Sequence, residues 1–173
     1  MEYFLIQEDR KNTNKIQVKL TNKQMDEEKA QVVFVDLEEE KDRPDLIEVN
    51  LMTRKEYIVS DRMKELMMVY ADEIKAEPCI LMDYDRKLQE NYWRIGLEVM
   101  DQAPVKNMGL YDAPEDMVLD ESVLENKYIF AIEKQKTIFW IASLHFVENF
   151  LRKNMFGIHW TRLKTVYGRE GNK

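Results

Sequence analysis

The chain has 173 residues, of which 45% are hydrophobic, and a formal net charge of −7 at pH 7. This length suits one domain with a substantial core, and the single Cys79 cannot form an internal disulfide bond. No apolar run reaches the length of a membrane helix and the N-terminus lacks signal-peptide character, so we expect a cytoplasmic protein. The negative charge disfavours binding to nucleic acid and to anionic membranes.

Alternating apolar residues predict most of the strands. Apolar side chains at every second position indicate a strand with one buried face, and short β-branched or aromatic runs add further strands. In chain order, the predicted strands are Phe4 to Ile6, Ile16 to Leu20, Val32 to Leu37, Ile47 to Leu51, Tyr57 to Val59, Trp93 to Val99, Tyr128 to Ile132 and Thr137 to Ile141. Only Met52 to Glu56 and Glu133 to Lys136 separate two of the pairs, which predicts two hairpins.

Two serines mark the expected starts of amphipathic helices. Apolar residues recur at three- and four-residue steps after Ser60 and again after Ser143, and serine is a favoured N-cap residue. Gly157 is expected to end the second helix in a left-handed cap. The spacing from Thr21 to Gln24 predicts a third helix that starts near Thr21.

The two predicted hairpins and helices resemble each other at an offset of 83 residues. In a gap-free alignment Ser60 falls on Ser143, and Ile80 falls on Leu163. We therefore predict an α+β fold, with a mostly antiparallel sheet and two Ser-capped amphipathic helices, in which a hairpin-helix-strand module is duplicated. The two modules, residues 44–100 and 126–167, belong to a single domain 1–173 and are joined by a long surface loop, 102–126.

No residue pattern in the chain is typical of an active site. His145 and His159 are the only histidines and lack the spacing of a metal pair, and five glycines are too few and too scattered for a phosphate-binding loop. Cys79 lies in an apolar run and is expected to be buried and inert. We expect no catalytic residues, metal or cofactor.

The acidic residues are the candidates for binding a partner. Residues 1–86 contain 14 Lys and Arg against 21 Asp and Glu, whereas residues 87–173 contain 12 of each kind. An acidic surface favours a basic protein partner. The candidates lie in the charged loop from Asp36 to Asp42 and in the loop 102–126: Asp36, Glu38, Glu39, Glu40, Asp42, Asp112, Glu115 and Asp116.

Several segments together resemble a bacterial immunity-protein family. They run from Tyr57 to Leu66, from Asn91 to Trp93 and on to Asp101, from Tyr128 to Phe130, from Phe139 to Ser143 and from Gly157 to Leu163. These segments resemble polymorphic-toxin immunity family eleven, once catalogued as a domain of unknown function, over roughly residues 44–167. The resemblance implies a cytoplasmic protein that binds and neutralises a cognate toxin domain without turnover, and it carries over no catalytic residue.

Two alternatives remain beside this expectation. One is an enzyme or small-molecule-binding protein whose site is assembled from scattered residues, for instance Asp83, Asp85 and His159. The other is a self-associating structural subunit with a methionine-rich interface. Met63, Met67 and Met68 would belong to such an interface.

Overall fold

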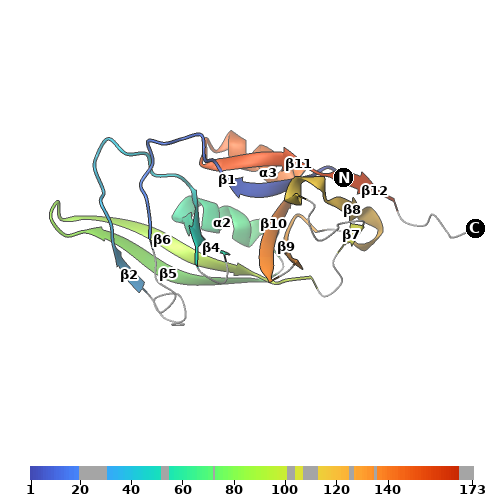
Figure 1. The fold of residues 1–173 in the computed structure, drawn as a ribbon, viewed down its shortest axis with the longest axis horizontal. Coiled ribbons are helices and arrows are strands. Elements are labelled where there is room, and N and C mark those ends of the chain that lie inside the picture. Colours follow the sequence, from blue (N-terminus) through green and yellow to red (C-terminus); the bar gives the residue numbers. More distant parts are fainter. Residues whose placement is uncertain are drawn as a thin grey trace, which may run out of the picture.

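The computed structural model describes residues 1–19, 31–51, 55–71, 73–100, 104–106, 113–124, 127–134 and 136–167. Most neighbouring strands are antiparallel and two α-helices accompany them in these residues, which confirms the α+β class (Figure 1). In chain order the elements are β1 (Tyr3–Glu8), β2 (Gln31–Phe34), β3 (Leu46–Asn50), β4 (Lys55–Ser60), α2 (Asp61–Tyr70), β5 (Ile74–Asp83), β6 (Leu88–Leu97), β7 (Val105–Lys106), the 3-10 helix η1 (Pro114–Asp116), β8 (Val118–Asp120), the 3-10 helix η2 (Glu121–Val123), β9 (Ile129–Lys134), β10 (Thr137–Ser143), α3 (Leu144–Arg152), β11 (Ile158–Arg162) and β12 (Lys164–Val166).

The first sheet has the strand order β2-β5-β6-β4-β3. Its strands β3 and β4 form the predicted hairpin, and α2 then leads to β5. Because β6 pairs antiparallel with both β4 and β5, β4 and β5 point the same way with β6 between them. The edge strand β2 runs parallel to β5.

The second sheet repeats this plan with a strand from the other end of the chain. Its order is β11-β1-β10-β9, where β9 and β10 form the second predicted hairpin and α3 leads to β11. The N-terminal strand β1 pairs antiparallel with both β10 and β11. β1 therefore occupies the place in this sheet that β6 occupies in the first.

The two hairpins have the same register at the predicted offset of 83 residues. Leu46 pairs with Val59, and Ile129 pairs with Ala142. Past the helices the offset becomes 84, because Ala76 pairs with Ile95 and the equivalent Trp160 pairs with Ile6. The gap-free match of Ile80 with Leu163 is therefore wrong by one position, and descent from a duplicated segment stays a prediction.

Two tyrosine hydrogen bonds follow the same correspondence. Tyr92, opposite Ser60 in the register of β4 and β6, donates its hydroxyl to the Pro44 carbonyl at 2.8 Å. Tyr3, opposite Ser143, donates to the carbonyls of Leu124 and Lys127 at 3.3 Å. In the first module a tyrosine of β6 thus holds the chain just before the hairpin β3–β4. In the second module a tyrosine of β1 does the same before the hairpin β9–β10.

The serine caps form as predicted. Ser60 Oγ accepts from the Met63 N–H at 3.2 Å, and Ser143 Oγ accepts from the Phe146 N–H at 3.5 Å. These bonds satisfy donors that the first turn of a helix leaves open. The prediction for Gly157 is wrong, since α3 already ends at Arg152 with Lys153 as its C-cap.

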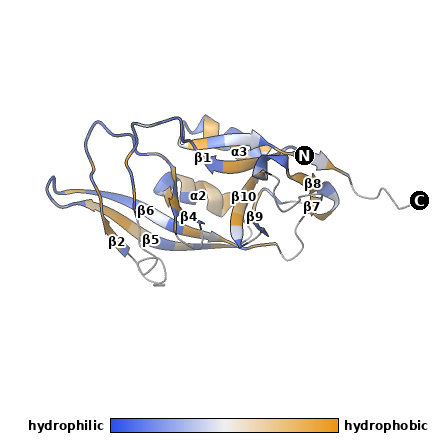
Figure 2. Ribbon diagram, in the orientation of Figure 1, coloured by the Kyte–Doolittle hydropathy of each residue, from blue (hydrophilic) through white to orange (hydrophobic). Residues whose placement is uncertain are grey.

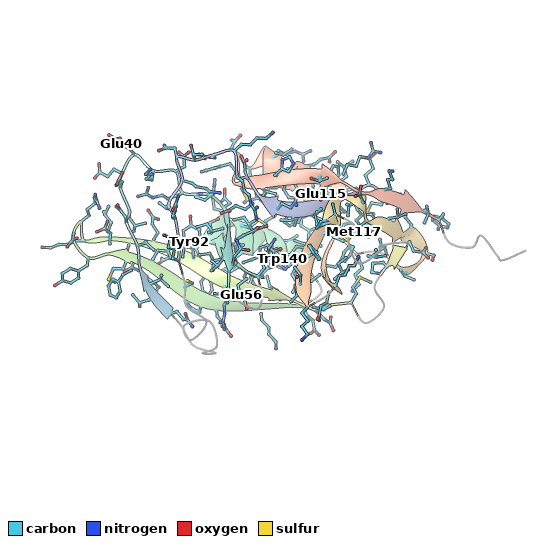
Figure 3. All side chains as sticks on the ribbon, viewed as in Figure 1. Glu40, Glu56, Tyr92, Glu115, Met117 and Trp140 are labelled. Atoms are coloured by element: carbon cyan, nitrogen blue, oxygen red, sulfur yellow. The ribbon has the colours of Figure 1, made fainter. Side chains whose placement is uncertain are left out.

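The main core lies where the two helices and the two sheets meet. It contains Tyr57 and Trp140 on equivalent strands, whose rings stack with centroids 4.2 Å apart, together with the buried faces of α2 and α3. Figure 3 labels Trp140 within the molecule. Two outer cores cover the opposite faces of the sheets, as the period-2 alternation of the strands requires.

The prediction of a surface loop over 102–126 is wrong for its described part. Residues 104–106 and 113–124 contain β7, β8 and two 3-10 turns, and β8 pairs antiparallel with β7 and parallel with β12. Met117, Leu119 and Leu124 are buried against the outer face of the second sheet. The elements are too short to show a period, so their partners decided their structure.

Other differences concern the N-terminal segment and one strand end. Residues 16–19 form no strand, although Ile16 is buried, and Leu20 together with the expected helix near Thr21 lies outside the described residues. The strand predicted over Val32 to Leu37 ends at Phe34 as β2. Val99 lies beyond β6 and forms an isolated bridge with Ala131 of β9.

Asp45 joins the two modules through a buried carboxylate. Its side chain accepts hydrogen bonds from the Ser60 hydroxyl, from Arg62 at 2.8 Å and from the Phe156 N–H at 2.9 Å, and the residue is 1% exposed. Its own N–H donates to the Phe156 carbonyl at 2.9 Å. Ser60 begins α2 and Phe156 follows α3, so one carboxylate ties the start of one helix to the turn after the other.

We expect Asp45→Ala to destabilise the fold by about 3 kcal/mol, because it removes a buried carboxylate that accepts from the part-buried Phe156 N–H and Ser60 hydroxyl. Urea denaturation measures the loss. Arg62→Ala removes only the half-exposed cation and should cost less than about 1 kcal/mol. Equal losses in both variants would show that the ion pair alone explains the contribution of Asp45.

Gly157→Ala should cost at least about 2 kcal/mol, since Gly157 has φ +97° and an added Cβ would lie 2.5 Å from Pro44 Cβ. Gly96→Ala is the matched control, because the nearest atom to its Cβ is Lys75 Cβ at 3.7 Å. Thermal melting of both variants measures the difference. Equal melting temperatures of the Gly157→Ala protein and the Gly96→Ala control would contradict the close contact between residue 157 and Pro44.

Candidate partner-binding surface

The acidic loop that follows β2 folds around an arginine. We call residues 36–42 the acidic loop. The Arg43 guanidinium donates to the backbone carbonyls of Glu38 at 2.7 Å, of Leu37 at 3.1 Å and of Lys41, and its Nε donates to Glu90 at 3.3 Å. A planar guanidinium with several fixed partners holds the loop backbone in one conformation.

The carboxylates of the acidic loop differ in their exposure and in their partners. Glu39 and Glu40 are exposed and Glu38 is half-buried, and Figure 3 shows Glu40 at the margin of the molecule. Asp36 pairs with Arg86 at 2.7 Å, and Asp42 accepts from the Asn12 amide at 2.8 Å. Glu39 and Glu40 therefore form the outward acidic part of the loop, whereas Asp42 and the also exposed Asp36 help to position it.

A buried aspartate connects the acidic loop to the turn between β5 and β6. Asp83 is 4% exposed and accepts from the N–H groups of Arg86 and Leu37, each at 2.9 Å, and from the Arg86 guanidinium at 2.8 Å. These bonds lower the pKa of Asp83 from 3.8 to about 2, and the bond from the Arg86 N–H has the largest effect. The turn and the loop are thus held together as one unit.

The remaining acidic candidates lie elsewhere. Glu115 and Asp116 are exposed on η1, where Glu115 accepts from the Gln7 amide at 2.8 Å. Figure 3 shows Glu115 far from Glu40. Asp112 lies outside the described residues. Among the described residues, the structure therefore places the acidic candidates in two separate patches, the acidic loop and η1.

The scattered residues of the alternative enzyme site do not meet. Asp83 ends β5 and Asp85 lies in the following turn, and both line an open hollow of about 500 Å³. His159 lies on β11 of the second sheet and lines a different hollow of about 260 Å³. Burial raises the pKa of the Cys79 thiol to about 11, which leaves it a poor nucleophile at neutral pH.

The hollow beside His159 contains a buried carboxylate that sequence reasoning missed. Glu48 accepts from the Glu8 N–H at 3.1 Å and pairs with Lys55 at 3.2 Å and with Arg10 at 3.5 Å. The alternation of Ile47 and Val49 along β3 predicts a solvent-exposed position for Glu48, but the end of β1 covers this face of the strand. Two cations and an N–H compensate its charge, so it serves to join β1 to the first hairpin.

The methionines of the proposed self-association surface are divided between core and surface. Met63 and Met67 are fully buried in the main core, and only Met68 is exposed, at 59%. A methionine-rich interface formed by all three is therefore wrong.

Comparison with protein-family models and with curated proteins gives no match to this chain. Among the described residues, no group of three or more His, Cys, Asp and Glu side chains is placed to hold a metal ion. No helix in that part of the chain is long and apolar enough to cross a bilayer. The resemblance to the immunity family stays a prediction.

The hydrogen bonds of Asp83 predict an acid-dependent loss of stability. Because its pKa is lower in the folded chain, its contribution is complete above about pH 4 and disappears as the pH falls toward about 2. Asp83→Asn should lower the melting temperature at pH 5 to 7, and the gap to the wild type should close between about pH 4 and pH 2.

Melting curves from pH 2 to pH 7 measure this effect. Asp85→Asn removes a carboxylate from the same turn, but from an exposed residue, and serves as the control. A gap between Asp83→Asn and the wild type that stays constant down to pH 2 would contradict the assignment.

Proposed function

We propose that this protein is a non-catalytic, immunity-type protein that binds and blocks a basic toxin domain in the cytoplasm. The observation that carries the proposal is the acidic loop, whose backbone is fixed by Arg43 while Glu39 and Glu40 stay exposed. The segments that resemble an immunity family support the same proposal.

A fixed loop favours tight binding for an entropic reason. Ordering a mobile loop upon association costs free energy, and a loop that is already ordered avoids much of that cost. The hydrogen bonds from Arg43 to the loop carbonyls and from the Leu37 N–H to Asp83 order the loop in the unbound protein. Blocking a toxin requires a complementary surface and no chemical step, which this arrangement can provide.

The charge of the loop also accelerates association. Exposed carboxylates of one sign steer a basic partner toward the surface, and salt screens this attraction over about 8 Å at physiological ionic strength. Loop charge should therefore change the association rate more than the dissociation rate, and more strongly at low salt.

The triple variant Glu38→Lys, Glu39→Lys, Glu40→Lys tests the proposal. We expect its association rate with a candidate basic toxin domain to fall by about tenfold or more at low salt, with a smaller effect at high salt. Stopped-flow or surface-based kinetics with an inactivated toxin domain measures both rates.

The control carries the same change in net charge on other surfaces. Glu65, Glu133 and Glu148 are exposed on α2, β9 and α3, and their joint replacement by Lys should leave most of the association rate intact. An equal fall in both triple variants would mean that net charge alone steers binding and would remove the acidic loop from the interface. Absence of binding by the wild-type chain would overturn the proposed function.

A further inference from the structure

Exposed aromatic residues gather at the end of the first sheet that carries the acidic loop. Phe34 of β2 is 67% exposed, and Tyr84 in the β5–β6 turn is 78% exposed. The register of β2 and β5 sets Phe34 beside Met82, and Tyr84 follows Met82 by two positions. Figure 2 shows hydrophobic residues on β2 and β5.

Strand alternation places Phe34, Met82 and Gln89 on one face of the sheet, and Tyr84 follows in the turn after β5. Val33 and Leu81 belong to the outer core of the first sheet, so their neighbours Phe34 and Met82 face the other way. On the third strand Gln89 lies opposite Met82, and Met82, Tyr84 and Gln89 line the open hollow of about 500 Å³. We call Phe34, Met82, Tyr84 and Gln89 the aromatic surface.

The aromatic surface belongs to the same rigid unit as the acidic loop. The loop follows β2 directly, and the Asp83 and Arg86 contacts fasten it to the turn that carries Tyr84. Residues 36–43 and 83–90 together hold eight acidic and four basic side chains, a net charge of −4 out of the chain's −7. Exposed aromatic rings thus lie within a strongly acidic end of the first sheet.

This composition matches the anatomy of a protein interface. Tyr, Phe and Met are enriched at the centres of interfaces, charged residues form the rim, and a few aromatic side chains contribute most of the binding energy. Rings surrounded by carboxylates also suit Arg and Lys, whose cations attract both and whose carbon chains cover the rings.

We propose that the aromatic surface is the apolar centre of the interface with the basic toxin domain, and that the acidic loop is its rim. This inference rests on the proposed function and names the residues that hold the partner after the charges have steered it. The matching toxin surface contains an apolar groove lined by Arg or Lys, into which Phe34 and Tyr84 insert.

The double variant Phe34→Ala, Tyr84→Ala tests this assignment. We expect the dissociation rate of the complex with the same inactivated toxin domain to rise by about tenfold or more, with little change in association rate. The increase in dissociation rate should depend little on salt, whereas the slower association of the acidic-loop variant should depend strongly on it. Both side chains are exposed, so the melting temperature should stay near that of the wild type.

Matched truncations elsewhere on the surface serve as the control. Tyr167 is 82% exposed beyond β12, and Leu151 is exposed on α3, so Leu151→Ala, Tyr167→Ala removes comparable side chains from other faces. This control should dissociate like the wild type.

The outcomes separate the two proposals. Faster dissociation of only the Phe34→Ala, Tyr84→Ala variant supports the aromatic surface. Unchanged dissociation of that variant, while the acidic-loop variant still associates slowly, would overturn the aromatic surface and leave the proposed function standing. A wild-type chain that does not bind the toxin domain would overturn both.

Discussion

The buried carboxylate of Asp45 is the constraint on which the arrangement of the two modules depends. A carboxylate at this depth is costly unless its oxygens are fully hydrogen-bonded, so its donors must converge on one point. Ser60 and Arg62 come from the start of α2, and the Phe156 N–H comes from the turn after α3. Because all these donors bind one carboxylate, the start of α2 is fixed relative to the turn after α3. The two sheets that carry these helices then pack against one shared core.

The insertion of β1 into the second sheet strengthens this coupling. The second sheet is completed by β1, although the rest of its module follows some 120 residues later in the chain. The end of β1 also covers Glu48 of the first hairpin, whose carboxylate accepts the Glu8 N–H. Neither module can therefore unfold without exposing polar groups of the other, and we expect cooperative unfolding of the whole domain.

The proposed binding end uses the same kind of interaction for a different purpose. Arg43 and Arg86 neutralise part of the local negative charge, but their main effect is to fix backbone and turn geometry. The remaining glutamates point outward on a rigid frame beside Phe34 and Tyr84. Charge that steers a partner and rings that hold it are then separate properties of one surface, which measurements of association and dissociation rates can distinguish.

Local patterns in the sequence determined the hairpins, the two serine caps and the α+β class, because alternation and capping act between residues close in the chain. Only the tertiary structure decided the insertion of β1, the small sheet around Met117 and Leu119, and the burial of Asp45 and Glu48, since each depends on partners distant in sequence. The acidic loop was predicted as a charged segment, yet its order comes from Arg43 and from the turn around Asp83. Phe34 was one apolar residue of a predicted strand, and only the pairing of β2 with β5 brought it beside Met82 and the turn that contains Tyr84.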